Sequence, residues 1–398
     1  MKPIKDEQVL NTPIVRNRLA YIDGLRGFAV LLVIVRHFYM DSFGPGMPRW
    51  ADICGLGYLG VHLFLLLSGF CLAYAFVGPK QKPLILREFF IRRATRILPA
   101  YYAALLLFTV LAMPFTMRDL LWQTLTHVTM THNVFPATVL AINGAFWSLG
   151  LECQLYLLFP VLILLIRRKG MLPVMAAVLL MQIVFRSIVA HYYGTEWNET
   201  MRVAWSLPGR MGDFTLGILA AMLVLDPKLY TIALKLKANA PMLTFASFAL
   251  GMLAKHRIGV SAWQTDLAFD CAFGSLLIWS SEGRTPDGRA SIASRLMSWR
   301  PLCRLGEKSY SVYLIHVLPL RLVVNALRSH NVSARHSLEF WMIPTIGLAI
   351  LFGYAFYWLV EGRYMRFFSQ RAGEHRARVA AMVPVPPALI LAVKSDKA

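Results

Sequence analysis

The sequence predicts an all-α polytopic membrane protein, a bundle of about ten transmembrane helices with both termini in the cytoplasm. Hydrophobic residues make up 57% of the 398 residues and charged residues only 16%, whereas a soluble chain carries about 25% charged residues. The apolar residues cluster in runs of roughly 18 to 22, the length of a helix that crosses the hydrocarbon core of a bilayer. Basic residues concentrate in alternate connecting segments, which sets the orientation of the bundle.

Ten apolar segments are expected to form the membrane spans. They lie at residues 24–42, 56–77, 97–113, 146–166, 171–190, 209–225, 240–254, 264–281, 304–326 and 338–360. If the N-terminus is cytoplasmic, the inner connecting segments hold most of the lysines and arginines and the outer ones hold few, which agrees with the positive-inside rule. The longest outer segment, 114–145, is expected to form a lid or a re-entrant loop.

The expected domain organisation is simple. Residues 1–20 form a cytoplasmic N-terminal segment, residues 21–365 the transmembrane domain and residues 366–398 a cytoplasmic tail, with no cleaved signal peptide and no appended soluble domain. The net charge of +20 would suggest nucleic acid as a partner of a soluble protein. In a membrane protein the positive-inside rule accounts for it, so the expected partners are the lipid bilayer and no nucleic acid. The five cysteines are dispersed, and neither they nor the histidines have the spacing of a metal site, so no metal is expected.

Three ionisable residues share one face of the first predicted span. Arg26 and His37 are eleven residues apart, which is three helical turns plus roughly 20°. Asp23 lies one turn before Arg26 and could also act only as a helix cap. Arg26 alone could be an interfacial anchor and His37 alone a helix–helix hydrogen bond. Because ionisable residues are costly inside a membrane, the shared face indicates a functional site.

A second group of polar residues follows in "FFIRRATRILPAYY". Arg92, Arg93 and Arg96 lie on the cytoplasmic side at spacings of three and four, so all three can face one ligand. Guanidinium groups suit phosphates, although ordinary anchoring to the membrane surface would also explain basic residues here.

Further intramembrane polar residues indicate a polar cavity. Glu152 lies inside the outer end of its span with Tyr156 one turn deeper, and His62 and His316 are intramembrane histidines. Each histidine alone is more often a packing or hydrogen-bonding residue than a catalyst. Ser68 lacks the strand–turn–helix context of a hydrolase nucleophile and is interpreted as a helix-packing residue.

Together these residues suit transfer between a phosphorylated donor inside the cell and an acceptor reached from outside. His37 can serve as a general base or as a nucleophile near neutral pH. Cytoplasmic arginines would hold the phosphates of the donor, and Glu152 could orient an acceptor hydroxyl or accept its proton. The residues alone do not name the donor.

An ordered set of motifs resembles the acyltransferase 3 family of membrane O-acyltransferases that act on carbohydrates. These are "YIDGLRGFAVLLVIVRHF", "GYLGVHLFLLLSGFCLAY", "RRATRILPAYY", "FWSLGLECQLYLLFP", "GRMGDFTLGILAA" and "GEKSYSVYLIHVL", which cover roughly residues 18 to 365. The resemblance implies an enzyme of the bacterial inner membrane. It would move an acyl group, most often acetyl from cytoplasmic acetyl-CoA, to a hydroxyl of a cell-surface, exported or lipid-linked carbohydrate. The donor is thus a substrate, and no other cofactor is implied.

The resemblance also assigns roles to individual residues. Its essential arginine–histidine pair falls on Arg26 and His37, and its remaining motifs fall on Asp23, Arg93 and Arg96 with Arg92 adjacent, Trp147, Glu152, Tyr313 and His316. The implied catalytic residues are His37, Asp23 and Glu152, and the implied donor-binding residues are Arg26, Arg92, Arg93 and Arg96. The residues expected to line the cavity are His62, Trp147, Tyr156, Tyr313 and His316.

Two departures from the family pattern matter. His62 stands where the family often has an acidic residue, which leaves its role open. Many relatives append an extracytoplasmic esterase-like domain, so a separate extracytoplasmic protein could assist this chain. Some relatives transfer succinyl or longer acyl groups. The alternative from another class is a transporter or flippase of a glycan or lipid-linked sugar, which would also need midplane charges but more often shows inverted repeats.

Overall fold

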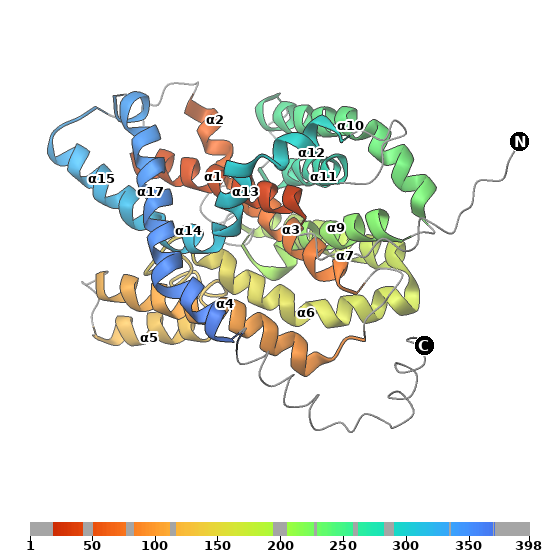
Figure 1. Ribbon diagram of the computed structural model, residues 1–398, viewed down its shortest axis with the longest axis horizontal. Coiled ribbons are helices and arrows are strands. Elements are labelled where there is room, and N and C mark those ends of the chain that lie inside the picture. The colour runs from red at the N-terminus through yellow and green to blue at the C-terminus, as the bar shows by residue number, and fades with distance from the viewer. Residues whose placement is uncertain are drawn as a thin grey trace, which may run out of the picture.

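The structure is a computed structural model that describes residues 19–42, 51–76, 83–111, 117–193, 205–226, 229–257, 262–281, 290–333, 336–368 and 370. Over these residues the chain is all-helical and contains no strand, which confirms the all-α part of the predicted fold class (Figure 1). The predicted N-terminal segment and C-terminal tail lie almost entirely outside the described residues.

The helices follow one another with short connections. In chain order they are α1 (Ala20–Ser42), α2 (Asp52–Gly55), η3 (Leu56–Tyr58), α3 (Leu59–Tyr74), α4 (Leu86–Leu111), α5 (Met117–Val128), α6 (Trp147–Lys169), α7 (Met171–Tyr193), α9 (Leu207–Leu225), α10 (Tyr230–Arg257), α11 (Ala262–Ser280), α12 (Ile292–Met297), α13 (Arg300–Glu307), α14 (Ser309–Ile315), α15 (Val317–Ser329), η5 (Ser337–Trp341), α17 (Met342–Phe356) and η6 (Tyr357–Glu361).

Six helices in the described part of the chain are long and apolar enough to cross a membrane. They are Ile53–Tyr74, Leu86–Leu111, Trp147–Lys169, Met171–Tyr192, Leu207–Leu225 and Glu339–Phe368, and a seventh results if α14 and α15 count as one bent span. Helices α1, α10 and α11 form where spans were predicted but do not meet this criterion. The chain is therefore a multi-pass membrane protein, while ten spans and cytoplasmic termini stay predictions.

The predicted span 304–326 is wrong as a single helix. Helix α13 ends at Glu307, and α14 and α15 meet at His316 with a bend of 42°. Pro319 lies in the first turn of α15 and lacks the N–H that would bond to the carbonyl of Ile315. The bend therefore has a local cause, and it places the His316 side chain at a break between two helices.

The connections before and after α4 also differ from prediction. Helix α4 begins at Leu86 rather than near residue 97, so the arginine cluster is helical and Pro99 lies inside the helix. The predicted outer loop 114–145 contains the amphipathic helix α5 followed by a segment of turns up to Phe146. Helix α6 ends at Lys169, and the C-cap residue Gly170 that follows has a φ of 86°, which favours glycine.

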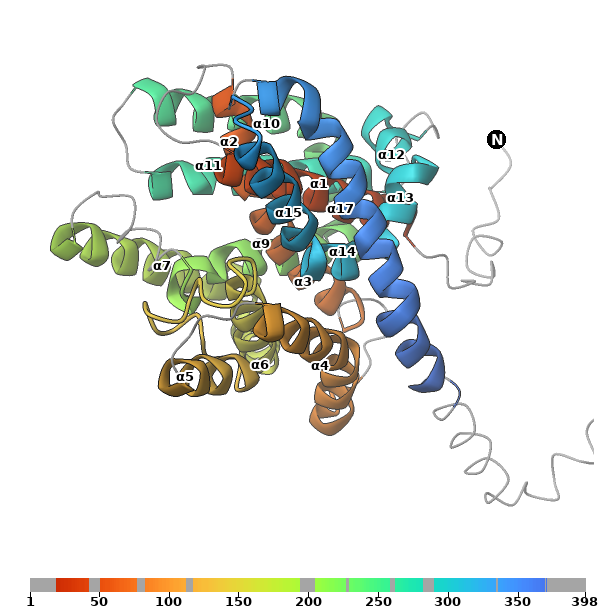
Figure 2. The same cartoon turned by 90° about the vertical axis from the view of Figure 1, so that its left-hand side faces the viewer.

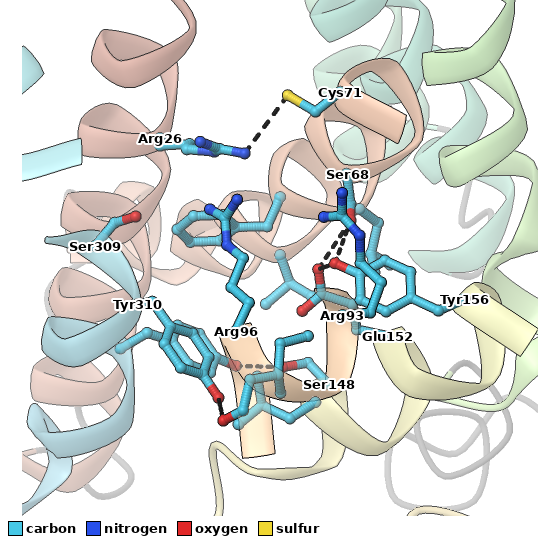
Figure 3. Close-up of a pocket in the computed structure, with 16 residues that line it drawn as sticks. Arg26, Ser68, Cys71, Arg93, Arg96, Ser148, Glu152, Tyr156, Ser309 and Tyr310 are labelled. Atoms are coloured by element: carbon cyan, nitrogen blue, oxygen red, sulfur yellow. Dashed lines mark hydrogen bonds between the residues drawn. The ribbon is translucent and has the colours of Figure 1, made fainter. Parts of the chain in front are cut away.

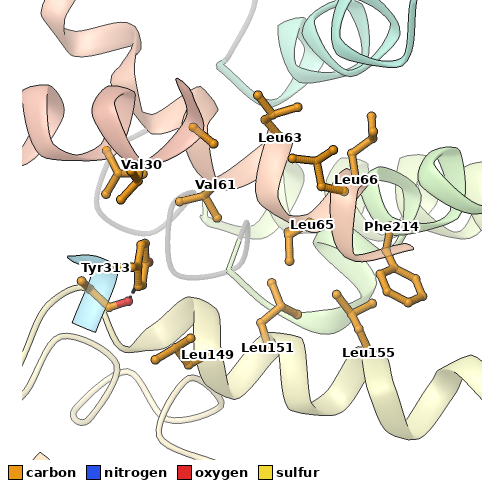
Figure 4. Packing of buried hydrophobic residues seen from close by; sticks show 14 of the residues in the cluster. Val30, Val61, Leu63, Leu65, Leu66, Leu149, Leu151, Leu155, Phe214 and Tyr313 are labelled. Carbon is orange, nitrogen blue, oxygen red and sulfur yellow. Dashed lines mark hydrogen bonds between the residues drawn. The ribbon is translucent and has the colours of Figure 1, made fainter. Parts of the chain in front are cut away.

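The core is built around α1 and α3. Helix α3 packs on α1 and α9, α1 packs on α13, and α10 pairs with α11. Helix α17 passes α14 and continues towards α4 along one side of the bundle (Figures 1 and 2). Apolar side chains of α3, α6 and α9 fill the space between these helices (Figure 4).

Glycines allow two of these helix pairs to approach closely. A Cβ atom on Gly217 of α9 would overlap the carbonyl oxygen of Leu66, and one on Gly69 of α3 would overlap that of Phe214. A Cβ atom on Gly306 of α13 would likewise overlap the carbonyl oxygen of Asp23 in α1. Small residues at such crossings are typical of membrane helix packing.

Candidate active site

One cavity, here called the arginine cavity, lies among α1, α3, α4, α6 and α14. It has a volume of about 100 Å³, and its charged lining residues are Arg26, Arg93, Arg96 and Glu152. Three guanidinium groups thus reach one cavity that holds a single carboxylate from the described residues (Figure 3). This excess of positive charge makes the cavity suited to an anionic ligand.

Hydrogen bonds fix the carboxylate of the arginine cavity. Ser68 Oγ donates to Glu152 Oε1 over 2.8 Å, and the Tyr156 hydroxyl donates to the same oxygen. The Ser68 and Tyr156 hydroxyl oxygens lie 2.9 Å apart. Ser68 is therefore part of the site's polar network, and its interpretation as only a packing residue was incomplete. Because Ser68 comes from α3 and the other two residues come from α6, the network joins these helices.

Two of the arginines have defined supports. Arg26 donates from Nη2 to Cys71 Sγ over 3.5 Å and lies 3.8 Å from the carboxylate of Asp23, one turn earlier in α1. The guanidinium carbon of Arg93 lies 5.7 Å from the ring centre of Tyr156, which is within the range of a cation–π contact.

A second cavity, here called the histidine cavity, lies beside the first. It has a volume of about 260 Å³, and its lining includes His37, His62, Trp147, Trp205 and Tyr313. Val61 and Tyr313 line both cavities, so these two side chains stand between them. The Tyr313 hydroxyl is fixed by the Ala145 carbonyl oxygen at 2.9 Å and by Ser148 Oγ at 2.6 Å.

The ring of His37 is held against the ring of His316. His37 Nδ1 lies 3.0 Å from the carbonyl oxygen of Val33 and 3.2 Å from His316 Nε2. His316 Nδ1 lies 2.7 Å from the carbonyl oxygen of Tyr313. A carbonyl oxygen can only accept, so in neutral rings both Nδ1 atoms carry hydrogen. His37 Nε2 then keeps a lone pair, which a general base requires.

The chain that carries these residues matches a known acyltransferase family over nearly its whole length. The model of that family, described as an acyltransferase domain, covers residues 19–361. The chain belongs to the acyltransferase 3 family. This confirms the resemblance drawn from its motifs.

Relatives of this acyltransferase 3 member include enzymes of known name. The peptidoglycan O-acetyltransferase OatA of Listeria monocytogenes is 25% identical over 326 residues, 76% of this chain and 49% of the relative. The O-acetyltransferase OatA of Staphylococcus aureus is 25% identical over 325 residues, 77% of this chain and 51% of the relative. The acyltransferase MdmB of Streptomyces mycarofaciens is 26% identical over 391 residues, 89% of this chain and 93% of the relative.

The chain spans about half the length of the two OatA proteins that it matches. No solved structure matches it.

The structure brings most of the predicted site residues of this acyltransferase 3 member together, but in two cavities rather than one. Arg26, Arg93, Arg96, Glu152 and Tyr156 line the arginine cavity. His37, His62 and Trp147 line the histidine cavity, Tyr313 lines both, and His316 contacts His37.

Three positions differ from expectation. Arg92 lies outside both cavities, is exposed and pairs with Glu88 at 3.3 Å, because consecutive arginines on a helix point about 100° apart. Asp23 contacts Arg26 and lies beside an opening next to the arginine cavity, not near His37. Glu152, expected towards the acceptor, shares a cavity with the three arginines.

The sequence analysis missed a buried ionic cluster beside the histidine cavity. Its members, all less than a tenth exposed, are His62 of α3, Arg186 of α7, Arg210 and Asp213 of α9, and Asp266 and Asp270 of α11. Asp266 Oδ2 lies 3.1 Å from both Arg186 Nη1 and Arg210 Nη1. His62 Nδ1 lies 2.7 Å from Asp270 Oδ1. The signal in the sequence was two acids four residues apart in a predicted span, which default to a functional hypothesis.

Part of this cluster has the donor atoms of a metal site. One atom each from His62, Asp213 and Asp270 lies within 4.8 Å of the others. However, Arg210 Nη1 lies 3.1 Å from His62 Nδ1 and 3.5 Å from Asp213 Oδ2, so a guanidinium already occupies the space among these groups. The positive charge of Arg210 opposes a metal ion there, and the expected absence of a metal stays a prediction.

Proposed function

We propose that this protein is a membrane-bound O-acyltransferase. It would move an acyl group, acetyl in the first place, from cytoplasmic acyl-CoA to a hydroxyl of a cell-surface, exported or lipid-linked carbohydrate. The observation that carries the proposal is the pair of cavities that meet at Val61 and Tyr313, one with three guanidinium groups and the other with His37. The names of the O-acetyltransferase relatives agree with it.

The arginines that line the arginine cavity would bind the donor. Coenzyme A carries three phosphate groups, and Arg26, Arg93 and Arg96 provide the charge to bind them. Asp23 would act by holding Arg26 rather than by touching a substrate, since its carboxylate lies 3.8 Å from that guanidinium. Glu152, fixed by Ser68 and Tyr156, would partly offset the repulsion among the three arginines and so hold their side chains around the donor. Arg92, although predicted for this role, does not line the cavity and pairs with Glu88 instead.

His37 would perform the proton transfer. Its Nε2 lone pair takes the proton of the acceptor hydroxyl as the oxygen attacks the carbonyl carbon of the thioester. The carbon–sulfur bond breaks, the new ester forms, and His37 returns the proton to the leaving thiolate. His316 would be a positioning residue, because its Nε2 accepts from His37 Nδ1 and, together with the Val33 carbonyl oxygen, holds the tautomer and the ring orientation of His37.

The acyl group has to pass between the two cavities. Tyr313 and Val61 line both, so the thioester of a donor in the arginine cavity would reach the acceptor at these residues. In the bacterial inner membrane, with cytoplasmic termini, the arginine cavity would open inwards and the histidine cavity outwards. A separate extracytoplasmic protein could deliver the acceptor.

The test uses purified protein in proteoliposomes with acetyl-CoA labelled in the acetyl group. We expect donor binding, and transfer of label to a bacterial glycan extract with release of free thiol. The double variant Arg93→Ala/Arg96→Ala should weaken donor binding, whereas Arg92→Ala, a matched control on the same helix, should not. Movement of a glycan across the membrane with neither donor binding nor thiol release would favour the transporter and sink the proposal.

A further inference from the structure

The histidine cavity carries positive charge that proton transfer to His37 does not need. Arg36 of α1, Arg210 of α9 and Arg321 of α15 line it, against one carboxylate, Asp41, among its described lining residues. Acyl transfer to a neutral hydroxyl requires a base and space, but no cation on the acceptor side. The arginines therefore call for a separate explanation.

Two of these arginines flank the proposed base. Arg36 precedes His37 in α1 and, although about 100° around the helix, lines the same cavity, with its guanidinium carbon 6.0 Å from the Tyr39 ring centre. Arg321 reaches the cavity from the opposite helix α15 and is exposed. In the proposed orientation both lie near the outer side, where the positive-inside rule disfavours arginine.

The third arginine is fixed in place by the buried ionic cluster. Arg210 is 3% exposed and pairs with Asp266 at 3.1 Å and Asp213 at 3.5 Å. Its charge is balanced by these acids, so Arg210 adds rigid donors to the wall rather than net charge. The attraction for an anion would come mainly from Arg36 and Arg321.

An aromatic pair forms another part of the wall. The Trp147 and Trp205 rings stack with centroids 5.1 Å apart and planes 25° apart, and both residues line the histidine cavity. A flat aromatic surface beside polar groups suits a sugar ring, which has an apolar face and a polar edge.

We propose that the histidine cavity binds an anionic carbohydrate, one with a carboxylate or a phosphate group. The sugar ring would pack on Trp147 and Trp205, the anion would pair with Arg36 and Arg321, and a hydroxyl would face His37. This inference rests on the proposed function, because it names the class of acceptor that the same site takes. Carboxylate and phosphate share the guanidinium chemistry, and the test separates them.

The test compares three acceptors in phosphatidylcholine proteoliposomes: methyl glucoside, methyl glucuronide and glucose 6-phosphate. Both transfer of labelled acetyl and equilibrium binding of each sugar are measured. We expect KM and Kd for at least one charged sugar to be lower than for the glucoside by about tenfold, the effect of one charge-assisted hydrogen bond. Whichever charged sugar binds more tightly identifies the anion.

Variants assign the effect to the arginines. Arg36→Gln and Arg321→Gln should each raise KM for the charged sugar far more than KM for the glucoside, and so remove most of the preference. Arg118→Gln on α5 removes an exposed arginine that lines neither cavity and should change nothing.

The outcomes separate this inference from the function on which it rests. Equal transfer to all three sugars would overturn the anionic acceptor and leave the acyltransferase intact. If Arg36→Gln and Arg321→Gln lose the same fraction of transfer to all three sugars, the inference is also overturned. The arginines would then stabilise the fold or bind lipid phosphates. If no sugar is acetylated but the charged one still binds more tightly, the binding site stands and the transfer chemistry fails.

Discussion

His37 Nδ1 lies 3.2 Å from His316 Nε2, across the bend that separates α14 from α15. The ring centres are 4.8 Å apart and the ring planes lie at 68°. Each Nδ1 also faces a backbone carbonyl oxygen, so one pattern of hydrogens satisfies both neutral rings. The bend at His316 thus has a consequence for chemistry, because it brings a second acceptor, beside the Val33 carbonyl oxygen, to the Nδ1 hydrogen of His37.

Removing the His316 ring should slow catalysis without changing donor binding. We expect His316→Leu to lower kcat by about 10²-fold, at the lower end of the effect of a positioned acid or base, with KM for acetyl-CoA unchanged. His316→Gln offers an amide oxygen as acceptor and should recover part of the rate. Steady-state kinetics of the two variants test this prediction. An equal loss of kcat in both would argue against His316 acting through His37.

Removing different acids from the buried ionic cluster should lower the free energy of unfolding by different amounts. Three carboxylates face two guanidinium groups, and Asp266 pairs with both arginines, whereas neither oxygen of Asp213 accepts a hydrogen bond from the described residues. Asp266→Asn should therefore cost about 3–5 kcal/mol, as for breaking a buried pair. Asp213→Asn should cost much less, because it removes excess negative charge. Thermal unfolding in one detergent compares the two, and equal losses would contradict the described charge balance.

A close helix crossing should not tolerate one methyl group. Gly217→Ala would place its Cβ against the Leu66 carbonyl oxygen and force α9 away from α3, at a cost of about 1–3 kcal/mol. Gly347→Ala in α17 is the matched control, since a Cβ there meets nothing within 4 Å. It should leave stability unchanged or raise it by up to about 1 kcal/mol, because alanine favours helix over glycine. Unfolding midpoints measured side by side test this contrast, and a Gly217→Ala variant as stable as the control would refute the contact.

Two stacked histidines after α4 should make stability depend on pH. His127 and His132 are fully buried with ring centres 4.1 Å apart. Burial, with a smaller effect of the His132 ring, lowers the pKa of His127 to about 3, and burial also lowers the pKa of His132. In the unfolded chain a histidine has a pKa of about 6.5. Between these values only the unfolded state takes up the proton, so stability is full above about pH 6.5 and falls as the pH decreases towards 3.

The pH dependence is measured by thermal unfolding from pH 7.5 to pH 4.5. His127→Gln should flatten the decrease relative to the unmodified chain, even if it lowers stability at pH 7.5. A decrease of the same size in both proteins would assign the effect to other groups.

Local patterns predicted much of the fold and part of the site. Each predicted span contains a helix because apolar runs of that length have few alternatives in lipid. The break at His316 was missed because Pro319 is tolerated in the first turn of a helix, and whether the preceding helix continues depends on packing. The helix α5 was missed because its amphipathic residues fall between spans.

The sequence implied one continuous polar site, whereas the structure has two cavities. Arg26 and His37 do share a face of α1, but the sequence could not show that Val61 of α3 and Tyr313 of α14 reach between them. Asp213, Asp266 and Asp270 come together only through the contact of α3, α9 and α11, which no local pattern specifies. Arg36 lines the histidine cavity although helical periodicity places it about 100° from His37 around α1.

The central claim is that His37 transfers the acceptor proton while the arginines hold the donor, and one measurement addresses it directly. The experiment reconstitutes three purified proteins with labelled acetyl-CoA and a glycan acceptor: the unmodified chain, His37→Ala and His191→Ala. The last variant is a control, because His191 is exposed and lies outside both cavities. We expect all three to bind acetyl-CoA equally, and His37→Ala alone to lose transfer. Near-normal transfer by His37→Ala, or an acetyl group trapped on His37 in the unmodified chain, would contradict its role as the general base.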